Sequence, residues 1–267
     1  MTKKLLVSDY DGTLIRSDGT ISPQQLKTIN DFIEKGNIFA VITGRMTSSI
    51  LPFVRKLGLK GLVASFNGGE VTEIETGKHI YTNYIDNQTA VEVFKAVEKS
   101  GAYIHGYHGE DCYCQNRTYY TNYYEQITSV EIKVLNRPLS QYFSDNNLLS
   151  KKILVMDDAD MCDKAMPYLE EFKDRLQVIR SNANQIEITT LNSTKANALE
   201  YLTKFYGIEK SNTYSCGDGG NDVSMILGAG VGFAVANAEP ILKSVAPKVL
   251  AYTNDQDAVK HIIEEEI

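Results

Sequence analysis

Two aspartates near the start of the chain have the clearest potential for chemistry. Asp9 and Asp11 directly follow the short apolar run 5–7, and Gly12 then allows a sharp turn. A run this short predicts a buried strand, and side chains two residues apart on extended backbone point to the same side. Two carboxylates held side by side repel each other, so a bound cation or a shared proton is needed to explain the pair.

A second acidic stretch, Gly217–Asp222, follows the predicted strand 213–216 and contains Asp218 and Asp222. The carboxyl ends of strands in an open α/β sheet meet at one edge, so these acids are expected to converge with the first pair. Such an oxygen-rich site suits Mg²⁺. A loop residue and a helix N-cap are the alternative interpretation of Asp218 and Asp222, but this leaves the paired acids unexplained.

Other polar clusters follow two further predicted strands. Thr43-Gly44-Arg45 comes after the apolar run 38–42, and Asn67-Gly68-Gly69 comes after 62–65. Both are expected at the same edge of the sheet. Lys195 stands at the start of a predicted helix, 194–206, where a surface lysine is the simpler alternative.

Alternating strands and helices at both ends of the chain must position these groups. The first helix begins at Ser22-Pro23, where Ser22 is expected to cap and Gln25 to complete a capping box, and it stops at Gly36. The alternation predicts an α/β fold, a doubly wound, Rossmann-like parallel sheet built from 1–85 and 188–267.

Residues 86–187 have a different character and predict an inserted α+β cap domain. A helix capped by Asn87 is expected to end at Gly101, a second helix covers about 160–173, and the strand-like segments are 102–107, 132–135, 152–156 and 185–189. The stretch 103–124 is rich in tyrosine. Both a pocket or interface and simple packing of a small sheet remain open for it.

Composition limits the class of protein. The chain has 267 residues, a net charge of −7 and a pI near 5.2, which argue against nucleic acid as the main partner but allow a local cationic site for phosphate. The run Met1–Asp9 reaches an acid too early for a secretory signal, and no apolar run has transmembrane length. We therefore expect a soluble, cytoplasmic protein, monomeric or weakly homo-oligomeric, with four reduced cysteines.

Four motifs in order resemble those of the haloacid dehalogenase (HAD) superfamily of phosphohydrolases, in its Cof-type branch with an α/β cap. They are Asp9-Tyr-Asp11-Gly-Thr-Leu, Thr43 in Ile-Thr-Gly-Arg, Lys195, and Gly217-Asp218-Gly-Gly-Asn221-Asp222. Asn67-Gly68-Gly69 also matches a feature of the branch, and the cap lies between the second and third motifs as in that branch. The stretch 190–196 departs from the pattern, because it lacks the Pro and two Gly that usually surround the lysine.

The resemblance implies a role for each matching residue. Asp9 would be the nucleophile, Asp11 the general acid and base, and Lys195 the counter-charge. The implied Mg²⁺ ligands are Asp9, the Asp11 main-chain carbonyl and Asp218, with Asn221 and Asp222 as ligands or in the surrounding layer. The residues expected to bind substrate are Thr43, Gly44, Arg45, Asn67, Gly68, Lys195 and Asn221.

The expected function is therefore Mg²⁺-dependent hydrolysis of small phosphate monoesters, with sugar phosphates as the favoured substrates and an aspartyl-phosphate as the intermediate. A phosphomannomutase-like phosphomutase is the first alternative, and it would need cap residues that hold a second phosphate. Arg117, Arg137 and Arg180 are its isolated candidates. A catalytically silent protein that binds a phosphorylated ligand is the second alternative.

Overall fold

The computed structural model describes residues 2–267, which divide into two compact units. The core unit comprises the residues up to Gly44 together with Leu51–Ile80 and Thr194–Ile267. The inserted unit comprises Arg45–Ile50 and Tyr81–Ser193. The long segment of the inserted unit begins before and ends after the predicted cap, 86–187.

The core unit is built on an eight-stranded sheet with the order β14-β13-β12-β1-β2-β3-β4-β5. At its centre β1 (Leu5–Ser8) pairs in parallel with β2 (Ile38–Ile42) on one side and β12 (Thr213–Gly217) on the other. The remaining strands are β3 (Leu62–Ser65), β4 (Glu70–Glu73), β5 (His79–Thr82), β13 (Val231–Ala234) and β14 (Lys248–Val249). Every residue of β1 is buried, as expected for a strand covered on both faces.

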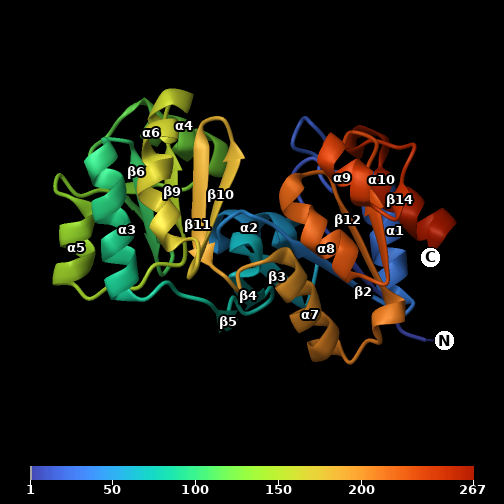
Figure 1. The fold of residues 1–267 in the computed structure, drawn as a ribbon. Coiled ribbons are helices and arrows are strands. Elements are labelled where there is room, and N and C mark those ends of the chain that lie inside the picture. Colours follow the sequence, from blue (N-terminus) through green and yellow to red (C-terminus); the bar gives the residue numbers. More distant parts are fainter. Residues whose placement is uncertain (1) are drawn as a thin grey trace. The chain divides into compact units, whose positions relative to one another are not determined.

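Helices cover both faces of this sheet. α1 (Pro23–Glu34) leads from β1 to β2, whereas α8 (Val223–Gly228) leads from β12 to β13 in the opposite direction along the sheet. Right-handed crossovers therefore place α1 and α8 on opposite faces, as Figure 1 shows. The other helices that lie wholly or partly in this unit are α2 (Thr47–Lys56), α7 (Lys195–Tyr206), α9 (Pro240–Val245) and α10 (Ala258–His261). The prediction of a doubly wound α/β core is confirmed.

The start of α1 differs in detail from the prediction. The Ser22 hydroxyl accepts a hydrogen bond from the Gln25 main-chain N–H, as expected of an N-cap. The Gln25 side chain does not return to Ser22, because its amide group donates to the Leu14 carbonyl and accepts from the Lys260 N–H. The predicted capping box is therefore wrong, and Gln25 instead ties α1 to two distant segments.

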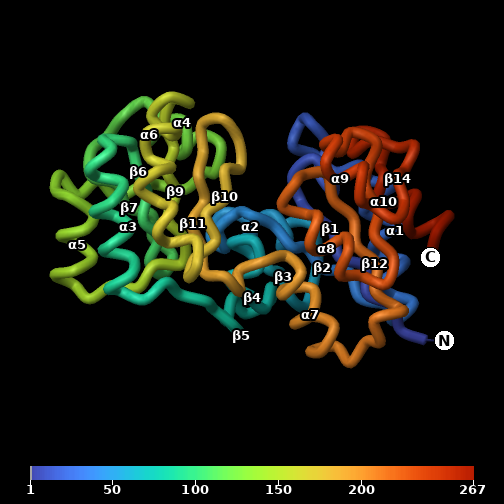
Figure 2. Tube along the Cα trace, viewed as in Figure 1, coloured from blue at the N-terminus to red at the C-terminus, as the bar shows by residue number. Residues whose placement is uncertain are grey.

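The inserted unit contains a six-stranded sheet with the order β10-β11-β9-β6-β7-β8. Figure 2 labels all of these strands except β8. Its strands are β6 (Ile104–His108), β7 (Asp111–Cys114), β8 (Ile132–Val134), β9 (Ile153–Met156), β10 (Leu176–Asn182) and β11 (Gln185–Thr190). Its helices are α3 (Asn87–Ser100), α4 (Tyr119–Thr128), α5 (Leu139–Asp145) and α6 (Ala159–Leu169). Apolar residues of α3, α5 and α6 pack with β6, β9 and β11 in one core.

One local prediction for the inserted unit requires correction. The N-cap of α3 is Asp86, whose carboxylate accepts the Thr89 N–H, rather than Asn87. The Asn87 amide instead donates to the carbonyls of Phe143 and Leu148 and so joins α3 to the end of α5.

Two further findings concern the chain as a whole. The four cysteines are unpaired and buried. None of the helices within residues 2–267 is both long enough and apolar enough to cross a bilayer.

Candidate active site

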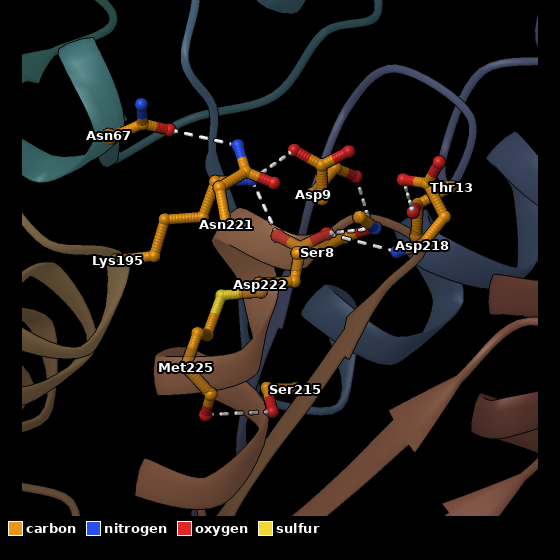
Figure 3. Close-up of polar contacts among 12 residues, drawn as sticks. Ser8, Asp9, Thr13, Asn67, Lys195, Ser215, Asp218, Asn221, Asp222 and Met225 are labelled. Atoms are coloured by element: carbon orange, nitrogen blue, oxygen red, sulfur yellow. Dashed lines mark hydrogen bonds and ion pairs between the residues drawn. The ribbon is translucent and has the colours of Figure 1, made fainter. Parts of the chain in front are cut away.

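The polar clusters predicted from the sequence lie at the carboxyl ends of neighbouring strands in the core unit. Asp9 follows β1, Thr43 follows β2, and Asp218 follows β12. A 3₁₀ turn, Phe66–Gly68, follows β3. Because β12, β1, β2 and β3 are successive parallel strands, these ends share one edge of the sheet. Figure 3 shows the residues that gather there.

Lys195 is the centre of this cluster. It is the first residue of α7, behind the N-cap Thr194, and only 1% of its surface is exposed. Its Nζ lies 2.5 Å from Asp9 Oδ1 and 2.5 Å from Asp222 Oδ1. The structure therefore excludes the interpretation of Lys195 as a surface lysine, since the ammonium joins two buried carboxylates.

Asp218 is held by the residues that follow the first aspartate pair. The Thr13 hydroxyl donates to Asp218 Oδ1 at 2.9 Å. At Gly12, where φ is +73°, a Cβ atom would lie 2.4 Å from Asp218 Oδ2. A residue with a side chain at position 12 would therefore collide with Asp218 and also be strained.

The Asp222 carboxylate is engaged at both oxygens. Oδ1 accepts from Lys195, and Oδ2 accepts the main-chain N–H groups of Asp218 and Gly219, each at 2.9 Å. A Cβ atom at Gly217 would lie 2.4 Å from Asp222 Cγ, so glycine is needed to admit this side chain. Through these bonds Asp222 holds both Lys195 and the loop that follows β12.

Burial and mutual repulsion raise the pKa values of two of the acids. Burial raises the pKa of Asp9 well above its usual range; the charges of Asp222 and Asp218 add to the rise, and Lys195 opposes it. Burial and the neighbouring Asp222 raise the pKa of Asp218 to about 6, against the hydrogen bond from Thr13. Burial acts to lower the pKa of Lys195, but the two carboxylates outweigh it and the pKa is raised.

These residues fit a divalent cation. Carboxylate oxygens of Asp9, Asp218 and Asp222 lie within 4.8 Å of one another, and oxygen is the ligand that Mg²⁺ prefers. Three carboxylates face one ammonium, so their charge is not balanced by the protein alone, as the raised pKa values of Asp9 and Asp218 indicate. Asp11 is exposed on the turn directly after β1.

The other predicted site residues of the core unit link adjacent loops. The main-chain N–H of Thr43 donates to the Ala64 carbonyl, and that of Asn67 donates to the Thr43 carbonyl. The Asn221 amide donates to Asn67 Oδ1 at 3.1 Å. A Cβ atom at Gly44 would lie 3.1 Å from the same oxygen. Asn67 is thereby in contact with both neighbouring clusters.

Two further predicted residues differ in their placement. Gly68 has a φ of +93°, and a Cβ atom there would lie 2.4 Å from the Thr194 carbonyl oxygen, so the turn after β3 packs tightly on the start of α7. Arg45, predicted to bind substrate, belongs by its contacts to the inserted unit rather than to the core unit.

Sequence reasoning missed three residues that hold the loops of the site. Thr13 is part of a quoted motif, but its contact with Asp218 was not predicted. Glu239 accepts the Gly220 N–H at 2.9 Å, and its own N–H donates to the Asp218 carbonyl at 2.7 Å. The Asn237 amide donates to the Gly12 carbonyl at 2.8 Å. Their partners come from remote segments, so no local pattern could have identified these roles.

Comparison with known proteins gives matches along nearly the whole chain. The family model of haloacid dehalogenase-like hydrolases matches residues 6–263. A 5-amino-6-(5-phospho-D-ribitylamino)uracil phosphatase of Bacillus subtilis is 26% identical, over 97% of this chain and 94% of the relative. An HMP-PP phosphatase of Serratia proteamaculans is 24% identical, over 98% of this chain and 94% of the relative.

A solved structure gives the same result for the fold. A haloacid dehalogenase-like hydrolase from Bacteroides thetaiotaomicron superimposes with a TM-score of 0.87 at 28% identity, and the match covers 98% of this chain and 99% of that chain.

Proposed function

We propose that the chain is a Mg²⁺-dependent phosphatase of small phosphorylated metabolites. The chain belongs to the family of haloacid dehalogenase-like hydrolases and is a phosphoric monoester hydrolase. The observation that carries the proposal is the bridge from Lys195 Nζ to Asp9 and Asp222, with Asp218 beside them. A buried cation against a carboxylate nucleophile is what attack on an anionic phosphate requires.

In the first half of the proposed reaction a carboxylate oxygen of Asp9 attacks phosphorus. The new O–P bond forms as the bond from phosphorus to the ester oxygen breaks, which gives an aspartyl-phosphate and an alcohol. Asp11 donates its proton to the departing oxygen. Lys195 remains against Asp9 and offsets the charge that the two anions bring together.

In the second half a water molecule attacks the phosphorus of the intermediate. Asp11, now a carboxylate, takes a proton from this water as the new P–O bond forms and the bond to Asp9 breaks. Inorganic phosphate leaves, and both aspartates return to their starting states. Thr43, Gly44, Asn67, Gly68 and Asn221 are proposed to contact the phosphate or the ester group, as is Arg45 of the inserted unit.

We assign the metal site to Asp9, the Asp11 carbonyl and Asp218, with Asn221 as a further ligand or in the surrounding layer. A bound Mg²⁺ would offset the excess carboxylate charge and polarise the phosphoryl group. Asp222, whose oxygens are occupied by Lys195 and two N–H groups, is proposed to position the lysine. Thr13 is proposed to orient Asp218 in the same way.

The mutase alternative gains no support from the inserted unit. It would need basic side chains able to hold a second phosphate, and the candidate arginines are engaged elsewhere. Arg117 pairs with Glu125, Arg137 with Asp145, and Arg180 with Asp163.

Sugar or polyol phosphates are the proposed substrates. Of the relatives described above, one is named for a substrate with a phosphorylated ribityl chain and the other for a small phosphorylated metabolite. A screen of phosphate esters should accordingly give its highest kcat/KM with a sugar or polyol phosphate. A higher value for phosphorylated proteins or nucleic acids would contradict this substrate class.

The test of the reaction is release of phosphate from p-nitrophenyl phosphate by the purified protein. We expect turnover with Mg²⁺, none with excess EDTA, and none in Asp9→Asn, because an amide cannot act as the nucleophile. Asp31→Asn is the matched control, since Asp31 lies on α1 and pairs with Lys27. Normal turnover by Asp9→Asn would exclude the proposed intermediate.

A further inference from the structure

The inserted unit contains a cavity of about 440 Å³ that the proposed reaction does not use. It is bordered by the end of α3, the start of β6, the β7–α4 loop and the end of β9, all of which belong to that unit. Its volume lies within the range of small-molecule sites in proteins. We therefore asked which ligand its side chains would recognise.

Three tyrosines form aromatic walls. The rings of Tyr119 and Tyr120 meet nearly at right angles, at 77° with centroids 5.4 Å apart. The rings of Tyr103 and Tyr120 stack at an angle of 28°, with centroids 6.1 Å apart. Each interpretation of the tyrosine-rich stretch therefore applies to a part of it. Tyr107 and Tyr113 are buried in the packing of the unit, whereas the other three tyrosines line a cavity.

Two carboxylates complete the lining. Glu98 accepts the N–H and the hydroxyl of Ser140, and Asp157 accepts the N–H groups of Tyr103 and Asp158. These bonds fix both acids without neutralising them. Within residues 2–267 neither carboxylate forms an ion pair, and no lysine, arginine or histidine lines the cavity.

The end of α3 adds to the negative character. Glu98 and Gly101 border the cavity at the carboxyl end of this 14-residue helix, which carries a partial negative charge. The amino end of α4 also borders the cavity, but Thr118 caps it by accepting the Thr121 N–H. The fixed charges therefore favour a cation over an anion.

We propose that this cavity binds a small organic ammonium ion, with its charge near Glu98 and Asp157 and its alkyl groups against Tyr119 and Tyr120. Aromatic faces attract ammonium ions through their negative π surface, and carboxylates without a cationic partner supply the counter-charge.

The probe for the test is choline, with the uncharged isostere 3,3-dimethylbutan-1-ol as its control. Both are titrated into the full-length protein by calorimetry, and the amide NMR signals of Ala102 and Ile104, which line the cavity, locate the site. We expect saturable binding of choline and at least about five-fold weaker binding of the isostere, since only choline gains from the carboxylates and the rings.

Two pairs of variants test the assigned side chains. Tyr119→Leu should weaken choline binding about three-fold or more, whereas Tyr168→Leu, at an exposed tyrosine of α6 outside the cavity lining, should not. Tyr119 is 73% exposed, so its replacement leaves the core intact. Glu98→Gln should also weaken binding, in contrast to Glu92→Gln on the same helix.

Three results would overturn the proposal: no saturable binding of choline, equal binding of choline and the isostere, or unchanged affinity in both Tyr119→Leu and Glu98→Gln. Turnover of p-nitrophenyl phosphate should stay at the wild-type level in all four variants, so this site and the proposed phosphatase site are tested separately.

Discussion

At the scale of single residues, the site depends on a buried lysine that two carboxylates share. Lys195 contacts Asp9 and Asp222 at the same distance, so the proposed nucleophile and the loop after β12 are held by one charged group. Breaking a buried ion pair leaves an uncompensated charge in the interior, which costs several kcal/mol. The arrangement therefore stabilises the geometry of the core unit as well as supplying the charge that the proposed reaction needs.

Replacing Thr13 with valine tests the positioning of Asp218. The substitution keeps the shape of the side chain but removes the hydroxyl that donates to Asp218 Oδ1. We expect the Mg²⁺ concentration for half-maximal activity to rise about ten-fold or more, with a smaller change in kcat at saturating Mg²⁺. Thr20→Val is the control, because the Thr20 hydroxyl contacts the exposed Asp18. An unchanged Mg²⁺ requirement would show that Thr13 does not orient the carboxylate.

The raised pKa of Asp218 predicts a pH-dependent response to Mg²⁺. In the metal-free protein this pKa is about 6, above the ordinary 3.8, so the folded state binds a proton more tightly than the unfolded state. The proton on Asp218 therefore stabilises the folded state fully below pH 3.8, and this contribution to the free energy of unfolding is lost as the pH rises through about 6. Carboxylates bind Mg²⁺ in their ionised form, so we expect Mg²⁺ to raise Tm strongly at pH 7.5 and much less at pH 5.

Differential scanning fluorimetry with and without Mg²⁺ at the two pH values measures this response. Protonation of Asp218 alone should lower the apparent Mg²⁺ affinity about ten-fold at pH 5. Sodium chloride at matched ionic strength serves as the control for screening. Equal shifts in Tm at pH 5 and pH 7.5 would contradict the assignment of Asp218 as a ligand.

At the scale of elements, the turn after β3 packs against the start of α7, the helix whose first residue is Lys195. Gly68→Ala should destabilise the protein by about 3 kcal/mol, because the left-handed backbone costs an alanine about 1 kcal/mol and the collision with the Thr194 carbonyl adds more. Gly36→Ala has the matching φ of +87° but nothing within 4 Å, so only the backbone cost applies. Urea unfolding of both variants isolates the contribution of the contact, and equal losses would show that it is unimportant.

The sequence was most informative where a pattern is local. Buried runs that end in polar residues predicted β1, β2, β3 and β12, and the parallel sheet brings their carboxyl ends to one edge. Predictions were wrong where a side chain has a distant partner. Gln25 contacts Leu14 and Lys260 instead of completing a local box, and Asn87 contacts the end of α5 while Asp86 takes the capping position.

The inserted unit was harder to predict for a related reason. The helix α4 buries only Thr121, so it lacks the buried apolar stripe that identifies a helix. The strand β10 is mostly half-exposed at the edge of its sheet, which weakens the alternation expected of a strand. Both elements form because neighbouring elements of the unit support them.

At the scale of the whole molecule, we predict that the inserted unit folds without the core unit. Its apolar core is formed entirely by residues between Ile85 and Ile188, so a fragment of residues 81–193 retains every member. We expect a single cooperative thermal transition by circular dichroism that Mg²⁺ does not shift. A fragment of residues 103–193 should not fold, because it lacks the apolar residues of α3. The absence of a transition in the longer fragment would place the domain boundary elsewhere.

The central position of β1 has a consequence for the order in which the chain is made. β1 is synthesised long before its neighbour β12, which begins at Thr213, the residue that pairs with Leu5. At translation rates of about 5–20 residues per second, one edge of this apolar strand stays unpaired for about 10–40 s. Lys195, the partner of Asp9, is also synthesised long after β1, and until β12 is made the nascent core unit presents an unpaired strand edge, which favours pairing with other chains.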